Sequence, residues 1–188
     1  GLSPVADGLI ATELARGDAS VGTWIGVHSG LAMGSIFVGG NDEQKRHWLP
    51  QMARMEKLGA FALTEPWRGS DAAHIETTAR RDGDHYVING AKRWIGLGNL
   101  ADVVVVWARD LANDGQIAGF LVEKGTPGFE AHLMAGKMAL RALGVADLTF
   151  TDVRIPAENR LGKSTSFRET AIVLTMTRYG VACAALGN

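Results

Sequence analysis

Residues 59–71 read G-A-F-A-L-T-E-P-W-R-G-S-D, and the rest of the chain can be arranged around this stretch. Its first half is apolar and has the composition of a buried strand, whereas its second half is a polar turn. Pro66 fixes φ and lacks an N–H donor, and Gly69 permits backbone conformations that other residues avoid. Thr64 and Ser70 place hydroxyl groups beside free backbone N–H groups. The stretch therefore predicts a pocket for a polar ligand at the end of a strand.

The stretch opens a region of short strands that extends to about residue 160. Asp82-Gly83-Asp84 predicts a hairpin, and Asn89-Gly90 predicts a second turn. The run V-V-V-V-W within residues 102–108 predicts a strand that is buried on both faces. Strands at this spacing indicate an antiparallel barrel or sandwich. The other strands are expected at residues 77–81, 85–89, 91–95, 117–123, 147–150 and 153–155, and Pro156 ends the series.

Helical sequence flanks the β region on both sides. A first helix is expected at residues 4–16, capped by Ser3, and a second one through about Val38, capped by Asp18 or Ser20. Asn41 and Gln44 then predict a capping box for a third helix. Pro50 is expected to interrupt that helix and to begin a short one at residues 50–55. Helical spacing returns from about Ser166.

Composition bounds the classes of protein that the chain can belong to. It has 188 residues, 46% of them apolar, and a formal net charge of -1, which supports a packed core and gives no basic face for nucleic acid. Cys183 is the sole cysteine, and its apolar surroundings favour a core residue over a nucleophile. The apolar run from Val21 to Gly39 is broken by polar residues and glycines, so we expect a buried helix and no membrane span. Both ends lie in helix-like sequence, from which we expect a piece of a longer protein.

Four phrases together resemble the acyl-CoA dehydrogenase family. They are F-A-L-T-E-P-W-R-G-S-D with the preceding Q-M-A-R-M-E-K-L-G-A, T-T-A-R-R-D-G-D-H-Y-V-I-N-G-A-K-R-W-I, A-D-V-V-V-V-W-A-R and T-R-Y-G-V-A. The resemblance implies an FAD-dependent oxidoreductase of fatty acid and lipid metabolism that desaturates acyl-CoA thioesters and passes electrons to an electron-transfer flavoprotein. It also implies a homo-oligomer, a tetramer or dimer, located in the cytoplasm if bacterial and in the mitochondrial matrix or peroxisome if eukaryotic.

The resemblance also implies an α+β multidomain fold in three parts. The end of an N-terminal helical domain is expected at residues 1–57, a central antiparallel β-barrel domain for flavin and substrate at 58–163, and the first helix of a truncated C-terminal helical bundle at 164–188. The family's glutamate base would lie beyond residue 188. We therefore expect no catalytic residue and no metal ligand in this chain, and no turnover by it alone.

The flavin residues implied by the resemblance fall in two phrases. Phe61, Ala62, Leu63 and Thr64 would line the flavin, Gly69 and Ser70 would contact its pyrophosphate, and Ser70 would also contact substrate. Trp94, Ile95 and Gly96 would form a second contact, with Trp94 packing at the edge of the ring system. Most members carry threonine where this chain has Gly96, so only a backbone N–H could serve there. The plainer alternatives are turn residues for Thr64 and Ser70 and a core tryptophan for Trp94.

Substrate contacts are implied at Ser20, Thr175 and Arg178, and a structural salt bridge remains an alternative for Arg178. The phrases K-R-W-I-G, G-F-L-V-E-K-G-T-P-G and T-R-Y-G-V-A are similar to the branch of glutaryl-CoA dehydrogenases and short-chain acyl-CoA oxidases. Glutaryl-CoA dehydrogenases carry an arginine before a serine to pair the distal carboxylate, whereas this chain has Ala19 and Ser20. Since an unpaired buried carboxylate is costly, we expect a short- or medium-chain monocarboxylic acyl-CoA.

Three other readings of the function stay open at this point. An acyl-CoA oxidase would use O2, and peroxide production would distinguish it from a dehydrogenase. A non-catalytic member of the fold would be colourless and free of FAD. A lipid-binding β-barrel with helices would not need the two flavin phrases.

Overall fold

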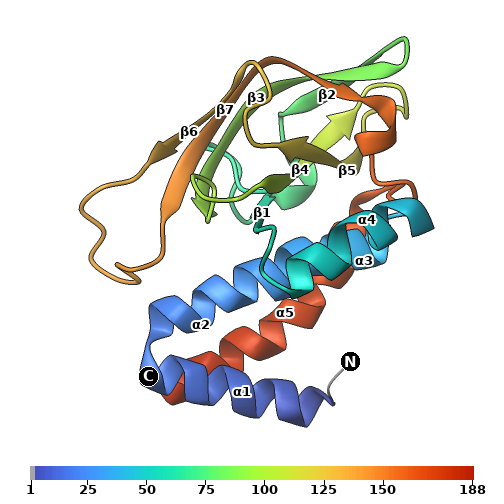
Figure 1. Ribbon diagram of the computed structural model, residues 1–188. Helices are drawn as coiled ribbons and strands as arrows, with labels where there is room; N and C mark the ends of the chain where they lie inside the picture. The colour runs from blue at the N-terminus through green and yellow to red at the C-terminus, as the bar shows by residue number, and fades with distance from the viewer. Residues whose placement is uncertain (1–2) are drawn as a thin grey trace.

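The computed structural model describes residues 3–188 and shows a curled β-sheet that lies on a group of helices (Figure 1). Gly1 and Leu2 lie outside the described residues. They belong to the N-terminal part expected at residues 1–57, and the expectation of a longer protein rests partly on them. The helices are α1 Pro4–Gly17, α2 Ala19–Ile25, a π-helical segment Gly26–Met33, α3 Gly34–Gly39, α4 Asp42–Ala53 and α5 Phe167–Gly187. The strands are β1 Gly59–Ala62, β2 Thr78–Asp82, β3 His85–Gly96, β4 Val103–Asp110, β5 Gln116–Glu123, β6 Phe129–Leu133 and β7 Val145–Pro156.

Helix caps form at Ser3, Asp18 and Asn41 as predicted, and a further cap forms at Ser166. The Ser3 side chain accepts the N–H of Ala6 and begins α1. Asp18 accepts the N–H of Ser20 and Val21 and so caps α2, which settles the choice between Asp18 and Ser20. The helical run from α2 continues through the π segment and α3 without a break, and Gly40 ends it. Capping boxes start α4 at Asn41 with Gln44, and α5 at Ser166 with Glu169.

Pro50 lies inside α4, so the predicted break and the separate helix at 50–55 are wrong. A proline in a helix removes one backbone hydrogen bond and is unfavourable by itself. Trp48 and Met52 of the same helix are buried in the core below the sheet, and this packing outweighs the local cost.

The sheet is mixed, which corrects the predicted antiparallel barrel. Within the described residues it has seven strands in the order β1-β4-β2-β3-β7-β6, and β5 pairs with β4. Both β1 and β2 run parallel to β4, whereas the other pairs are antiparallel. The sheet curls over itself as in half of a barrel (Figure 1).

The structure corrects two local predictions in the β region, adds one strand and confirms one hairpin. Asn89-Gly90 does not form a turn, because β3 runs through it with a register shift against β7 between Ile88 and Gly90. The two strands expected at 147–150 and 153–155 form the single strand β7, and β6 was not predicted. The hairpin at Asp82–Asp84 is confirmed, with Gly83 in the left-handed region at φ 63°.

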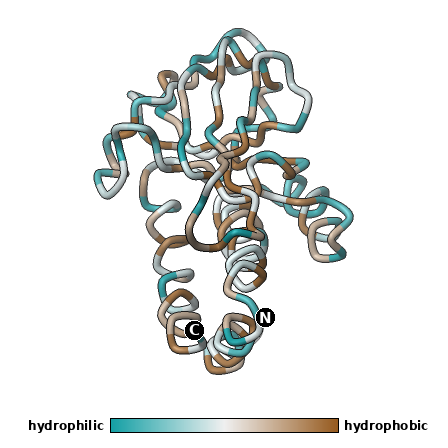
Figure 2. The backbone as a smooth tube through the Cα atoms, turned by 90° about the vertical axis from the view of Figure 1, so that its left-hand side faces the viewer, coloured by the Kyte–Doolittle hydropathy of each residue, from teal (hydrophilic) through white to brown (hydrophobic). Residues whose placement is uncertain are grey.

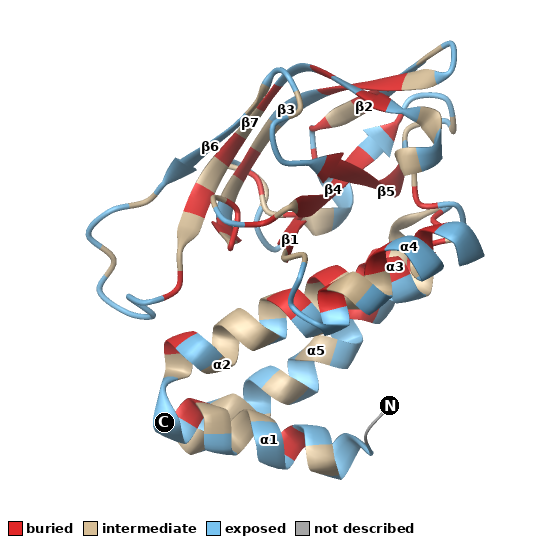
Figure 3. Ribbon diagram, viewed as in Figure 1, coloured by how far each residue is buried: buried red, intermediate tan, exposed pale blue. Residues whose placement is uncertain are grey.

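Two cores lie on the two faces of the sheet. β4 contributes Val104 and Val106 to the core inside the curl and Val103 and Val105 to the core between sheet and helices. Figure 3 shows the resulting burial along β4 and β5 and on the helices nearest the sheet. The predicted strand that is buried on both faces is therefore confirmed.

The far ends of the helices carry exposed apolar side chains. Figure 2 shows apolar residues along the helices below the sheet as well as in the sheet itself. By length and composition alone, the helical runs Ala19–Gly39 and Phe167–Gly187 could each cross a membrane. Core helices of soluble proteins have the same length and composition, so these two features do not by themselves indicate a membrane span.

Cys183 is half-buried where α5 packs on α1.

Candidate functional site

β1 forms an edge of the sheet and leaves backbone donors free at its end. It pairs with β4 on one side only. The Gly59 N–H points away from β4 and donates to His28 Nδ1 at 3.1 Å. Because N–H groups alternate along a strand, that of Phe61 points to the same unpaired side. The side chains of Phe61 and Leu63 are buried in the core on the helix side, so these residues offer a ligand their backbone only.

Trp94 stands out from the sheet beside this edge. Its backbone lies in the left-handed region at φ 60°, where the pairing of β3 with β7 shifts register between Lys92 and Ile95. The bulge leaves 63% of Trp94 exposed, whereas the neighbouring Ile95 is buried. The Arg93 N–H donates to the Thr64 carbonyl at 2.8 Å and so joins the two predicted flavin phrases directly. Trp94 is therefore an exposed aromatic side chain at a bulge, and the core-tryptophan alternative is excluded.

The π-helical segment packs against both phrases through glycines. A Cβ on Gly96 would lie 3.1 Å from Val27 Cγ2. A Cβ on Gly59 would lie 2.8 Å from the Ala32 methyl and 2.4 Å from Met52 Cε. Glycine at these two positions thus allows the helix to approach the sheet closely. His28, fully buried, accepts from Gly59 and bonds the Met52 carbonyl through Nε2 at 3.0 Å, which links helix, strand and α4.

A buried ion pair lies between the two phrases. Lys92 Nζ is 2.9 Å from Glu65 Oε1 and 3.0 Å from the Leu63 carbonyl oxygen, and the exposed fractions of the Lys92 and Glu65 side chains are 0% and 5%. Glu65 also accepts the N–H groups of Glu76 and Thr77 at 2.6 and 2.9 Å. Burial lowers the pKa of Lys92 to about 8, against the attraction of Glu65. Burial also raises the pKa of Glu65, but the charge of Lys92 and the hydrogen bonds outweigh it and bring that pKa below its ordinary value.

The predicted polar turn follows directly after Glu65. Glu65 and Arg68 exchange backbone hydrogen bonds, so Pro66 and Trp67 form the tip of a tight turn as predicted. Gly69 and Ser70 are exposed. The expectation of a special backbone at Gly69 is wrong, because its φ is not positive and a Cβ there would meet nothing within 4 Å.

Two hollows adjoin the predicted residues. One of about 530 Å³ is lined by Arg68, Ala73, His74, Ile75, Glu76, Arg109 and Gly115. Its two guanidinium groups differ in their partners: Arg68 pairs with Glu76 at 2.8 Å, while Arg109 forms no ion pair with the described residues. The other, of about 220 Å³, lies between Ser20, Val21 and Trp24 of α2 and Ala142.

Thr175 and Arg178 both lie exposed on α5. The Thr175 hydroxyl donates to the Ala171 carbonyl of its own helix. Within residues 3–188 Arg178 forms no ion pair, so the structural salt bridge is not seen, and no bond brings Arg178 to either flavin phrase. The same residues hold no group of three or more His, Cys, Asp or Glu side chains placed to bind a metal ion.

Sequence reasoning missed Lys92, Arg68, Arg109 and Trp24. Lys92 carried a usable signal, because it lies four residues after the buried Ile88 and therefore on the same face of the strand. Arg68 and Arg109 come together only through the parallel pairing of β2 with β4, which the sequence does not reveal.

Two family models match the chain. That of the acyl-CoA dehydrogenase middle domain matches residues 60–153, and that of the acyl-CoA dehydrogenase N-terminal domain matches residues 1–56. The short-chain specific acyl-CoA dehydrogenase from mitochondria of Rattus norvegicus is 40% identical over 191 aligned residues, which cover 100% of this chain and 46% of that protein.

Solved structures are similar over the whole chain. Glutaryl-CoA dehydrogenase from Mycobacterium smegmatis has a TM-score of 0.95 at 44% identity, covering 100% of this chain and 48% of that chain. A second structure of that enzyme, in complex with FADH2, has the same TM-score and coverage at 41% identity. A chain in a structure described as electron transferring flavoprotein of Acidaminococcus fermentans has a TM-score of 0.92 at 37% identity, covering 100% and 50%. This chain thus spans about half the length of the relatives that it matches.

Proposed function

Because the chain belongs to the FAD-dependent acyl-CoA dehydrogenase family, we propose that the full-length protein introduces a double bond between the α and β carbons of an acyl-CoA thioester. The observation that carries the proposal is the unpaired edge of β1 beside the exposed ring of Trp94. Bound FAD supplies the acceptor for the hydride that leaves the β carbon.

The residues at this edge fit the chemistry of a flavin. The N–H groups of Phe61 and Thr64 are fixed donors, and fixed donors favour the negative charge that a flavin gains on reduction. Thr64 adds a half-buried hydroxyl, and Ala62, Ile95 and Gly96 complete the two phrases beside it. Trp94 offers an aromatic face or edge to the apolar part of the ring system.

A pyrophosphate fits the polar turn that follows. Gly69 and Ser70 are exposed there, so that a backbone N–H and a hydroxyl can donate to phosphate oxygens. Arg68 and Arg109 add positive charge from the neighbouring hollow. Ser70 also serves the substrate in this proposal, as do Thr175 and Arg178 from α5.

The acyl group proposed is a short- or medium-chain monocarboxylic one. The hollow at Ser20 is lined by Val21, Trp24 and Ala142, and none of its lining residues within 3–188 is a cation that could pair with a distal carboxylate. We expect the full-length protein to oxidise butyryl- or hexanoyl-CoA faster than glutaryl-CoA. Ala19→Arg should raise kcat/KM for glutaryl-CoA at least tenfold, and a preference of the unchanged protein for glutaryl-CoA would contradict the assignment.

The catalytic base is proposed to lie outside this chain, and the domain boundaries at 57/58 and 163/164 are proposed with it. The matched ranges 1–56 and 60–153 fall within the first two of these parts.

The electron acceptor and the setting complete the proposal. We propose transfer to an electron-transfer flavoprotein, in a homo-oligomer, in the mitochondrial matrix or a peroxisome of a eukaryote or the cytoplasm of a bacterium. Support comes from relatives of mitochondrial and bacterial origin and from the Acidaminococcus fermentans structure.

The test is the purified full-length protein with butyryl-CoA. A yellow protein that reduces an artificial acceptor without forming peroxide supports the dehydrogenase. Peroxide in stoichiometric amounts assigns the oxidase instead, and a colourless protein without FAD assigns a non-catalytic member of the fold.

A further inference from the structure

Lys92 and Glu65 form a buried ion pair to which the proposed reaction assigns no part. Both side chains are almost completely removed from solvent, and their charged atoms are 2.9 Å apart. Taking two charges out of water costs free energy that their attraction often fails to offset, so apolar residues of similar volume frequently replace such a pair without loss of stability. A contribution to folding stability therefore does not by itself explain why this chain has a buried ion pair at Lys92 and Glu65.

The position of the pair relative to β1 gives a stronger reason. The Lys92 ammonium donates to the Leu63 carbonyl, one residue beyond the end of β1. The adjacent Arg93 N–H donates to the Thr64 carbonyl. Residues 92 and 93 thus fix residues 63 and 64 to the strand that carries Trp94 two positions further along.

The bond to Leu63 also acts on the donors of the same backbone. The Leu63 carbonyl shares a peptide unit with the Thr64 N–H, and among residues 3–188 no acceptor bonds that N–H. An ammonium group on the carbonyl oxygen polarises the peptide and makes its N–H a stronger donor. Glu65 keeps the ammonium in place, while the Glu76 and Thr77 N–H groups keep Glu65 in place.

We propose that Lys92, held by Glu65, is a positioning residue for the flavin: it orders residues 61–64 against Trp94 and strengthens the Thr64 N–H as a donor to the reduced ring. This rests on the proposed function, because it assumes that FAD binds at the edge of β1. It predicts a role in flavin affinity and flavin potential that a merely structural ion pair would lack.

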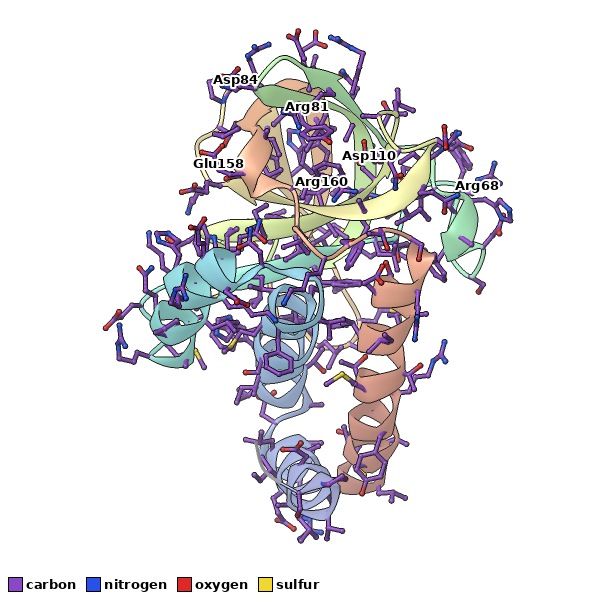
Figure 4. All side chains as sticks on the ribbon, turned by 90° about the vertical axis from the view of Figure 1, so that its right-hand side faces the viewer. Arg68, Arg81, Asp84, Asp110, Glu158 and Arg160 are labelled. Carbon is purple, nitrogen blue, oxygen red and sulfur yellow. The ribbon has the colours of Figure 1, made fainter. Side chains whose placement is uncertain are left out.

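The test uses the full-length protein and three variants. Lys92→Met combined with Glu65→Leu replaces the pair by apolar side chains, and Glu65→Gln removes the counter-charge alone. Asp110→Asn is the matched control, because Asp110 and Arg160 form a second buried pair, 2.7 Å apart with side chains 2% and 18% exposed. Neither of those residues bonds to residues 61–64 or 94–96, and Figure 4 shows both away from Arg68, which lies at the rim of the sheet.

The readouts are FAD dissociation from the protein, the midpoint potential of bound flavin and the thermal stability of the apoprotein. In the double variant we expect FAD to bind at least tenfold more weakly. We also expect the affinity for reduced flavin, relative to that for oxidised flavin, to fall about tenfold. This change lowers the two-electron midpoint potential of the bound flavin by about 30 mV. Asp110→Asn should lower thermal stability and leave both flavin readouts unchanged.

Each outcome decides the proposal. A folded double variant with unchanged affinity and potential overturns it, as does Asp110→Asn with flavin losses of the same size. If the double variant does not fold, the same two flavin readouts of Glu65→Gln decide: unchanged affinity and potential overturn the proposal, and losses in both support it. A starting protein that binds no FAD refutes the proposed function instead, so the two failures are distinguishable.

Discussion

At the scale of single residues, Gly96 shows how a departure from a family pattern can have a steric cause. The sequence alone indicates only that a hydroxyl is missing beside the flavin phrase. The structure adds Val27, whose methyl group lies 3.1 Å from the position of a Cβ on Gly96. Val27 and Gly96 therefore fit each other, and the glycine belongs to the packing of the π-helical segment on β3.

This contact predicts the behaviour of Gly96→Thr. Because the added side chain must displace Val27, the single variant should lose about 1 to 3 kcal/mol of unfolding free energy. Combining it with Val27→Ala should restore most of that loss, and Val27→Ala alone serves as the control. Urea unfolding measures the stabilities, and the flavin potential then reports the effect of the hydroxyl itself. Equal losses in the single and double variants would show that Val27 is not the obstacle.

Lys92 predicts a dependence of stability on pH. Its pKa in the folded chain, about 8, lies below the ordinary 10.5, so the unfolded chain binds more protons between these values. The free energy of unfolding contributed by Lys92 therefore rises with pH across this window. Glu65, whose pKa is lowered, is ionised in both states there and adds no slope.

The measurement compares the apoprotein with its Lys92→Met variant by urea unfolding at pH 7.5 and pH 10.5. The difference in unfolding free energy should move in favour of lysine by about 1 to 3 kcal/mol over this interval. Parallel pH profiles would mean that Lys92 titrates at its ordinary value.

At the scale of elements, the sequence predicts whatever depends on neighbours along the chain. The caps at Ser3, Asp18 and Asn41 form as expected, because a cap is a contact over two or three residues. The mixed sheet was not predictable, because the parallel pairing of β1 with β4 joins segments some 40 residues apart. The prediction of a turn at Asn89-Gly90 failed for a related reason: the extra residue of the bulge lies on β7 opposite Asn89, so β3 continues through both residues.

Gly59 and Gly69 predict opposite results for the same substitution. Gly59→Ala pushes a methyl group to 2.8 Å from the Ala32 methyl, so it should cost about 1 to 3 kcal/mol of unfolding free energy. The Cβ added by Gly69→Ala would have no atom within 4 Å, and the backbone of Gly69 is not in the left-handed region. This substitution should therefore change the free energy of unfolding by less than about 0.5 kcal/mol. If Gly69 approaches the pyrophosphate as proposed, the second variant should still bind FAD more weakly. A stable Gly59→Ala variant would contradict the close approach of helix and strand.

At the scale of the whole molecule, the candidate site has an unpaired strand edge, and the carboxylates of Glu65 and Asp147 in its two phrases and beside them already have partners. Glu65 is bonded to Lys92 and to two backbone N–H groups. Asp147 pairs with Arg93 at 3.2 Å and accepts the Trp94 N–H. A general base must be free to reach the proton that it removes. Within the described residues neither carboxylate beside Trp94 meets that condition.

Because Glu65 and Asp147 already have partners, we expect residues 1–188 to bind FAD without oxidising an acyl-CoA. Residues 1–188 produced alone and supplied with FAD should show no oxidation of butyryl-CoA with an artificial acceptor, whereas the full-length protein should show it. Flavin fluorescence during titration of the short chain with FAD provides the necessary control, because a chain that binds FAD and still does not turn over lacks the base and not the cofactor. Turnover by residues 1–188 would instead place the base within them, and Glu65→Gln and Asp147→Asn would then identify which of the two carboxylates leaves its partners to act.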